Sequence, residues 1–96
     1  MKYTVKYTAK FKKDYKQAQK QGLNTDKLLQ VVALIASGTE QEKLRTEYDD
    51  HALVGNWKGY RECHIESDWI LIYELLENIL VLSLSRTGTH SKLLNK

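Results

Sequence analysis

The sequence predicts one small α+β domain, in which one strand and two helices precede a meander of three antiparallel strands. Its 96 residues leave room for one hydrophobic core. A composition of 42% hydrophobic and 28% charged residues is typical of a folded globular chain rather than a disordered one. Hydrophobic residues follow helical spacing in the first third of the chain and form strand-like runs in the last third. We therefore expect a single domain over 1–96 in the order β-α-α-β-β-β, with both helices packed on one face of the sheet.

The first third of the chain predicts the strand and the two helices. The alternating stretch KYTVKY near the start is typical of a strand. Thr8 is a suitable N-cap for a helix that runs to about Lys20. A second helix is expected from Asn24 or Thr25 to about Ala36. Each helix has an apolar stripe at helical spacing, formed by Phe11, Tyr15 and Ala18 in the first and by Leu28, Val31, Val32 and Ile35 in the second.

The remaining two thirds predict a polar connection and the strand meander. Residues 39–59 contain few large apolar side chains, so we expect a loop with one helical turn at most. Strands are expected at 60–66, 69–76 and 79–86, and a last helical turn at 89–95. Connections of hairpin length make the three strands antiparallel neighbours. The sheet face that the two helices leave uncovered would be available for function.

The net charge of +3 is unevenly distributed along the chain. Within residues 1–30, eight lysines stand against two aspartates. Such a basic segment indicates a polyanionic or acidic partner. A solvated, lysine-rich helix face with no partner is an equally weighted alternative.

The chain shows no sign of a membrane span or a secretion signal. No apolar run approaches the roughly 20 residues needed to cross a bilayer, and the first residues lack an apolar signal core. Cys63 is the sole cysteine, so no internal disulfide forms and the cytoplasm is the simplest location. Neighbouring strand residues point to opposite faces, so we expect Cys63 in the core rather than paired with His64 as a nucleophile.

Three histidines in the second half are the leading catalytic candidates. His51, His64 and His90 fall in loops or strands, and an imidazole can give or take a proton near neutral pH. The meander should bring Asp68, Trp69 and Arg86 to the same sheet end as His64 and His90. The loop that carries His51 would then cover this group.

These residue types suit RNA cleavage without a metal ion or other cofactor. Arginine offers a planar fork of donors for a phosphate, and the histidines and the carboxylate offer an acid and a base. Trp69 could stack on an unpaired base. In this chemistry the ribose 2′-OH loses its proton and attacks the adjacent phosphorus, while an acid protonates the leaving 5′-oxygen.

Each candidate also has a purely structural interpretation. A single histidine is more often structural than catalytic. A zinc site is disfavoured, because the sequence contains no His-x₃-His or Cys-x₂-Cys spacing. Glu62 can share the strand face of His64 and is a weaker candidate for proton transfer or charge tuning. Trp57 is expected to pack its loop rather than bind a base.

Four short motifs together resemble a known family of bacterial toxins. They are His-x-Leu-x-Gly-x-Trp from His51, Tyr-Arg-x-x-His from Tyr60, Asp-Trp-Ile-Leu-Ile-Tyr from Asp68 and Arg-Thr-Gly-Thr-His from Arg86. Jointly they are specific, although each is weak alone. With the stretch FKKDYKQAQKQG in the first helix, they resemble the YafQ branch of the RelE/ParE toxin superfamily over nearly the whole chain.

The resemblance implies a RelE-like domain and a ribosome-dependent mRNA endonuclease. An antitoxin would hold it inactive, and the free toxin would cut mRNA in the ribosomal A site. The matching site positions are His51, His64, Asp68, Trp69, Arg86 and His90. His90 would be the general acid and Arg86 the phosphate clamp. The 2′-OH proton would be handled by His51, His64 or Asp68, and the choice among these three stays open.

Two positions depart from the family pattern. Ala52 replaces a proline after the loop histidine, and Leu94 replaces an aromatic residue near the C-terminus. We expect Leu94 to contact substrate without aromatic stacking, which is worth about 1–3 kcal/mol per base.

Lysines on the first helix would bind 16S rRNA or an acidic antitoxin helix. They are Lys10, Lys12, Lys13 and Lys16. The antitoxin would be a small acidic or DNA-binding protein, and the pair could assemble on operator DNA.

Two other functions remain as alternatives. ParE-like toxins share this fold and inhibit gyrase without a nuclease site, but the three histidines argue against that interpretation. An inactive homologue that only binds antitoxin has slight support from Ala52 and Leu94.

Overall fold

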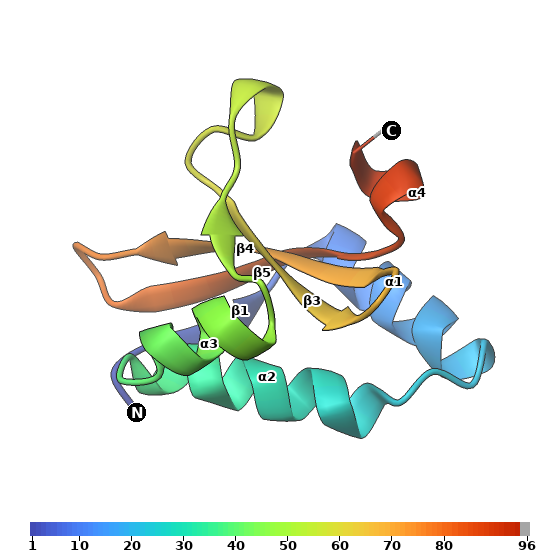
Figure 1. The fold of residues 1–96 in the computed structure, drawn as a ribbon, viewed down its shortest axis with the longest axis horizontal. Coiled ribbons are helices and arrows are strands. Elements are labelled where there is room, and N and C mark those ends of the chain that lie inside the picture. The colour runs from blue at the N-terminus through green and yellow to red at the C-terminus, as the bar shows by residue number, and fades with distance from the viewer. Residues whose placement is uncertain (95–96) are drawn as a thin grey trace.

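The computed structural model describes residues 1–94, which form one five-stranded sheet with helices on either side (Figure 1). The strand order is β1-β5-β4-β3-β2. β3 (Arg61–Glu66), β4 (Trp69–Leu76) and β5 (Val81–Gly88) are the predicted antiparallel meander. β1 (Thr4–Tyr7) adds to the outer side of β5 in parallel, and the two-residue β2 (His51–Ala52) adds to β3. The predicted α+β class and the two helices on one sheet face are confirmed.

The two N-terminal helices begin at the residues that the sequence indicates. α1 (Ala9–Lys20) follows Thr8, whose side-chain oxygen accepts the N–H of Phe11 at 3.0 Å. α2 (Thr25–Ser37) follows Asn24 and ends at Gly38, which takes the left-handed backbone conformation (φ 74°) that glycine adopts most readily. No helix within residues 1–94 is long and apolar enough to cross a membrane.

The connection after α2 is more ordered than predicted. Gln41–Glu47 form α3, a helix of seven residues, where the sequence indicated one turn at most. Leu44 is its buried residue and packs into the main core. A 3₁₀ turn, η1 (Gly55–Trp57), follows β2, and α4 (His90–Leu94) is the predicted last helical segment. The segment 51–60 and α4 rise on one side of the sheet, opposite α2 and α3 (Figure 1).

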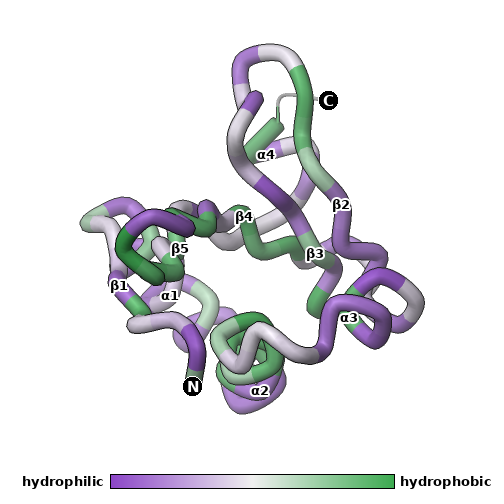
Figure 2. Tube along the Cα trace, turned by 90° about the vertical axis from the view of Figure 1, so that its left-hand side faces the viewer, coloured by the Kyte–Doolittle hydropathy of each residue, from purple (hydrophilic) through white to green (hydrophobic). Residues whose placement is uncertain are grey.

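Two apolar clusters lie on opposite faces of the sheet. The larger one joins α1, α2 and α3 to the sheet, and Figure 2 shows hydrophobic residues on α2, β4 and β5 where these elements meet. The smaller one packs Ile70, Ile72 and Leu93 against Leu53 and Trp57. Trp57 therefore packs its loop, as predicted. The face left uncovered by α1 and α2 is not fully open, because segment 51–60 and α4 cover part of it.

Cys63 lies in the main core with no exposed surface, as expected from its strand position. Burial raises the pKa of its thiol well above the ordinary value, and nearby Asp50 and Glu62 add to this effect. We therefore expect no alkylation of the native protein by iodoacetamide at pH 8, over a time in which protein unfolded in guanidinium chloride reacts completely. Mass spectrometry of both samples measures this. Equal rates in the two states would contradict a buried thiol.

Candidate functional site

The strand register brings sequence-distant residues into two rows on one face of the sheet. In the first row His51 pairs with Glu62, and Glu62 pairs with Ile72. In the second row His64 pairs with Ile70, which pairs with Gly88. Paired residues on neighbouring strands project from the same face, so His51, Glu62 and His64 share a face. His90 follows Gly88 by two residues and enters from the start of α4.

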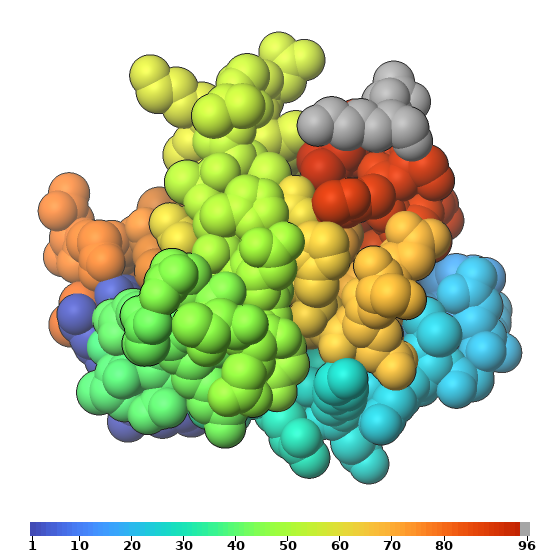
Figure 3. Space-filling view, viewed as in Figure 1, coloured from blue at the N-terminus to red at the C-terminus, as the bar shows by residue number. Residues whose placement is uncertain are grey.

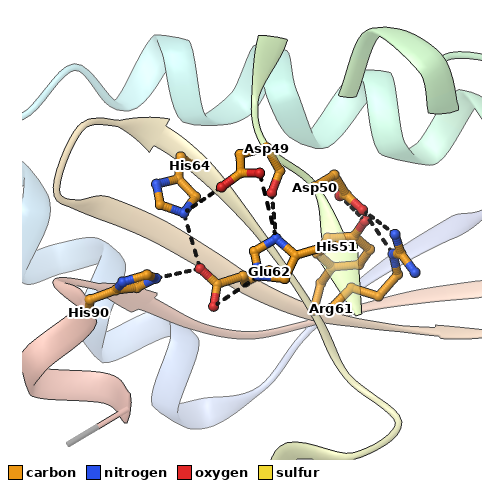
Figure 4. A network of polar contacts seen from close by, with 8 residues as sticks. Asp49, Asp50, His51, Arg61, Glu62, His64 and His90 are labelled. Carbon is orange, nitrogen blue, oxygen red and sulfur yellow. Dashed lines mark hydrogen bonds and ion pairs between the residues drawn. The ribbon is translucent and has the colours of Figure 1, made fainter. Parts of the chain in front are cut away.

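Glu62 is the centre of this group, and its side chain is only 2% exposed (Figure 4). One carboxylate oxygen, Oε1, contacts Nε2 of His90 and lies 3.2 Å from Nε2 of His64. The other oxygen, Oε2, lies 3.8 Å from Nε2 of His51. The rings of His64 and His90 meet edge to face, with centroids 5.0 Å apart. Three imidazoles from separate elements thus surround one buried carboxylate, which can hold them in place.

The backbone beside His51 fixes which of its nitrogens carries the proton. Nδ1 lies 2.7 Å from the carbonyl oxygen of Asp49, and a carbonyl can only accept a hydrogen bond. The proton of the neutral ring is therefore on Nδ1, and Nε2 keeps a free lone pair on the side facing Glu62. Asp49 makes this contact from a left-handed conformation (φ 51°), which aspartate tolerates better than most residues.

A buried polar network supports this loop from the opposite sheet face (Figure 4). Oδ1 of Asp50 accepts from Nε and Nη2 of Arg61 at 2.8 and 2.7 Å, and Oδ2 accepts from the hydroxyl of Tyr73. Burial raises the pKa of Tyr73, and the charge of Asp50 adds to this, so Tyr73 remains a neutral donor. Partial burial lowers the pKa of Arg61, but the hydrogen bond to Asp50 and the charge of Asp50, with smaller contributions from Tyr73, together outweigh this and raise its pKa. The network ties the residues just before β2 to β3 and β4.

Arg86 lies in the first row, paired with Ile72, but its guanidinium is held by α1. Nε and Nη2 donate to the carboxylate of Asp14 at 2.7 and 3.2 Å, and the N–H of Thr87 donates to the same carboxylate at 3.1 Å. The hydrogen bond to Asp14 raises the pKa of Arg86 against partial burial, so it keeps its charge. No hydrogen bond or ion pair within residues 1–94 joins Arg86 to the histidines.

Asp68 and Trp69 do not join the histidines as the strand order suggested. Asp68 is exposed in the turn between β3 and β4, and no polar contact in the described part of the chain links it to an imidazole. Trp69 is 5% exposed in the main core, and its Nε1–H donates to Thr87 Oγ1 at 2.8 Å. Both border a separate hollow beside Asp14 and Thr89. In this arrangement the Trp69 ring is not free to stack on a base.

A second hollow lies between segment 51–60 and α4, the two elements that carry His51 and His90 (Figure 3). Its volume is about 550 Å³, and its lining is mostly apolar with Leu94 among it. The lining residues are Leu53, Val54, Asn56, Trp57, Lys92, Leu93 and Leu94. Leu94 thus lines this hollow from the helix that also carries His90, and no histidine is among the described lining residues. The lysines Lys10, Lys12, Lys13 and Lys16 are all exposed on α1.

The central position of Glu62 has a partial signal in the sequence. Glu62 and His64 are two residues apart in a strand, so their side chains share a face. A charged residue in a short strand is ordinarily solvated, and its burial depends on the contacts from β2 and α4. Asp14 and Asp49 were missed because their partners come from tertiary contacts alone.

The comparison with known proteins supports the family resemblance. Residues 3–95 match the family described as the bacterial toxin of type II toxin-antitoxin system, YafQ. The chain is similar to the mRNA interferase toxin YafQ of Escherichia coli strain K12, with 45% identity over 76 residues, which are 79% of this chain and 78% of the relative.

Two groups of solved structures share the fold. The crystal structure of the E. coli DinJ-YafQ toxin-antitoxin complex has a TM-score of 0.84 and 41% identity, and covers 97% of this chain and 98% of the other. The crystal structure of a metal-bound toxin from Helicobacter pylori has a TM-score of 0.86 and 36% identity, and covers 95% and 98%. Sequence, fold and family match agree, and the chain belongs to the YafQ family of bacterial toxins of type II toxin–antitoxin systems.

Proposed function

We propose that this toxin is a ribosome-dependent mRNA endonuclease that cleaves by metal-independent acid and base catalysis. One observation carries the proposal: imidazoles from β2, β3 and α4 surround the buried carboxylate of Glu62. The related E. coli toxin is an mRNA interferase, which supports the same substrate class here.

In the proposed reaction His51 is the general base. Its Nε2 has a free lone pair, because Nδ1 donates to the Asp49 carbonyl, and its side chain is 46% exposed. His51 Nε2 takes the proton of the ribose 2′-OH, and the oxygen attacks the adjacent phosphorus. His64 is the less suitable base, because its Nε2 lies 3.2 Å from Glu62, against 3.8 Å for Nε2 of His51, and its side chain is only 25% exposed.

His90 is the general acid of the same step. Its Nε2 contacts the carboxylate of Glu62, which orients the ring, and the protonated ring gives its proton to the 5′-oxygen as the bond from that oxygen to phosphorus breaks. The products are a 2′,3′-cyclic phosphate and a 5′-hydroxyl. His51 is left charged and His90 neutral, and proton exchange with solvent restores both.

The remaining site residues bind and position the RNA. We assign Arg86 to a phosphate, with Asp14 holding the guanidinium in a fixed orientation. Leu94 and the hollow beside it receive a base, and the exposed lysines of α1 bind 16S rRNA. Asp68 and Trp69 lie outside the proton-transfer group in this proposal. The partner is a small antitoxin, by analogy with the E. coli relative solved with DinJ.

The test is cleavage of an mRNA during translation by purified ribosomes. We expect cuts on translated mRNA, none on the same RNA without ribosomes, and fragments that end in a cyclic or 3′-phosphate and a 5′-hydroxyl. A zinc-selective chelator that spares Mg²⁺ should leave the rate unchanged, which matters because a relative is known with metal bound. A 5′-phosphate on the fragments, or a rate abolished by the chelator, would overturn the mechanism. Gyrase trapped on DNA with intact mRNA would overturn the function.

Glu62 is proposed as a positioning residue, because its buried side chain touches the imidazoles and not the RNA. Glu62→Gln removes the carboxylate that contacts His90 and orients its ring, so we expect kcat for cleavage to fall about 10²-fold with little change in KM. Glu66→Gln, two positions beyond His64 and exposed, is the matched control and should cleave at the wild-type rate. A Glu62→Gln variant with wild-type kcat would show that the carboxylate has no part in the reaction.

A further inference from the structure

We propose that a groove beside α1 binds an unpaired nucleobase of ribosomal RNA between a row of aromatic rings and two lysines. This aromatic groove has a volume of about 460 Å³ and is formed by β1, α1 and α2. Its apolar part consists of Tyr7, Phe11, Tyr15 and Leu29. The inference rests on the function proposed above for the ribosome as the source of the RNA, whereas the affinity for a base rests on the groove itself.

Three rings stand in a row along the aromatic groove. The ring centroids of Tyr7 and Phe11 are 6.0 Å apart with 23° between the planes, and those of Phe11 and Tyr15 are 6.1 Å apart with 32°. Phe11 is 3% exposed and supports its neighbours from the core, whereas Tyr7 is 52% exposed. No other aromatic side chain within residues 1–94 is as exposed. A base can extend this row by stacking on the Tyr7 ring, as bases do on aromatic side chains in sites for single strands.

Two lysines give the aromatic groove a positive rim. Lys12 and Lys16 are exposed and stand four residues apart on α1, so they lie on one face of this helix. None of the described lining residues is acidic. The lysines can pair with the phosphates on either side of a stacked base, and the amide of Gln19 offers the base edge a donor and an acceptor. The groove therefore combines a stacking surface with positive charge, the two features that sites for single strands require.

The position of the aromatic groove indicates ribosomal RNA rather than the message at the scissile bond. β1 and β2 are the opposite edges of the sheet, and Figure 2 shows β1 and α1 on the other side of the molecule from β2 and α3. None of the described lining residues belongs to β2, β3 or α4, which carry the three imidazoles. RNA held in the groove is therefore separate from the nucleotides at the imidazoles. Ribosomal RNA forms most of the RNA surface that a ribosome offers to a bound toxin.

An acidic amphipathic peptide is the other ligand whose charge matches the lysines. The two ligands place different demands on the Tyr7 ring. A leucine side chain of a peptide packs on an aliphatic wall as well as on an aromatic one, whereas a base gains stacking only from a ring. The exposed ring at the open end of the row favours the base, and replacement of that ring by leucine separates the two cases.

The binding arm titrates the protein, without ribosomes, with a single-stranded RNA of about 12 nucleotides, long enough for a site of this kind. Every 2′-OH is methylated, so the strand cannot be cut, and one base is 2-aminopurine, whose fluorescence falls when it stacks. We expect Tyr7→Leu to weaken binding about 5–150-fold, which corresponds to the loss of one stacked base, and to abolish the quenching. Tyr7→Phe keeps the ring and should match wild type, and melting temperatures check the fold.

The contribution of the lysines is measured by the salt dependence of the same binding. Each phosphate contact to a single strand contributes about 0.7 to the slope of log affinity against log salt concentration. The double variant Lys12→Gln, Lys16→Gln should therefore lower this slope by about 1.4. Lys43→Gln, exposed on α3 and outside the described lining of the groove, is the control and should keep the wild-type slope.

Two results of the binding arm would overturn the base site. One is equal affinity and equal quenching for Tyr7→Leu and wild type. The other is a strand that does not bind, together with tight binding of a helical peptide of glutamate and leucine by both wild type and Tyr7→Leu. That second result would identify the groove as a docking surface for an acidic protein.

The ribosome arm compares wild type and Tyr7→Leu in cleavage of a translated mRNA. We expect Tyr7→Leu to raise KM for the ribosome by a factor similar to its loss of affinity for the strand, with little change in kcat, because the groove lies away from the imidazoles. A wild-type KM for this variant would overturn the assignment to ribosomal RNA. A wild-type chain that binds the strand through Tyr7 but cleaves no mRNA would refute the proposed function and leave the base site standing.

Discussion

His90→Ala is expected to lower mRNA cleavage by about 10²–10⁴-fold, the range that a positioned acid supplies. The variant loses the proton donor for the 5′-oxygen, and no other imidazole within residues 1–94 starts from α4. The fold should persist, because the side chain is 37% exposed and alanine is a good helix residue. The measurement is the rate of fragment appearance on a translated message, with the melting temperature as a check on folding.

Ser91→Ala is the control for this substitution. Ser91 is exposed, lies next to His90 in α4 and has no contact with Glu62 among the described hydrogen bonds. It should cleave at the wild-type rate. Cleavage by His90→Ala within a factor of two of wild type would exclude the acid role of His90 and leave His64 as the alternative.

Asp50→Asn is expected to lower the free energy of unfolding by about 2 kcal/mol, because hydrogen bonds to charged groups contribute about 1.5–3 kcal/mol. The amide cannot offer Arg61 a charged partner, and it places an NH₂ group where the Tyr73 hydroxyl or the guanidinium needs an acceptor. For a domain of this size the melting temperature should fall by roughly 8–16 °C. Calorimetry or denaturant unfolding measures the change.

Asp49→Asn is the matched control, because it makes the same chemical change one position earlier. Asp49 has a side chain 73% exposed, and asparagine also tolerates its left-handed conformation. Its effect on stability should stay within about 0.5 kcal/mol. If both substitutions lowered the free energy of unfolding equally, the buried network around Asp50 would contribute no more to stability than the exposed turn at Asp49.

The parts of the fold that local pattern determines were predictable from sequence. Thr8 and Asn24 cap their helices, and β4 covers the predicted 69–76. The length of α3 was predicted too short. Leu44 is its sole buried residue, so the sequence of this helix shows no repeat of apolar residues at helical spacing. β2 is two residues long and depends on pairing with β3, so nothing in its own sequence distinguishes it from loop.

The candidate site was predictable in its imidazoles and less so in its carboxylates. His51, His64 and His90 do converge, but around Glu62 rather than Asp68. The choice between the two acids depends on strand register, and a shift of one residue changes the face that a side chain occupies. Cross-strand contacts and the burial they produce are properties of the folded chain and have no local signature.

The parallel pairing of β1 with β5 has a consequence for how the cell makes this toxin. A nascent chain leaves the ribosome from its amino end, so β1 waits for a partner strand that is synthesised some 75 residues later. His90 follows later still, near the carboxyl end. The complete five-stranded sheet and the proposed acid can therefore form only after residues 81–90 have been synthesised. Until then the nuclease site proposed for this chain lacks one of its three imidazoles.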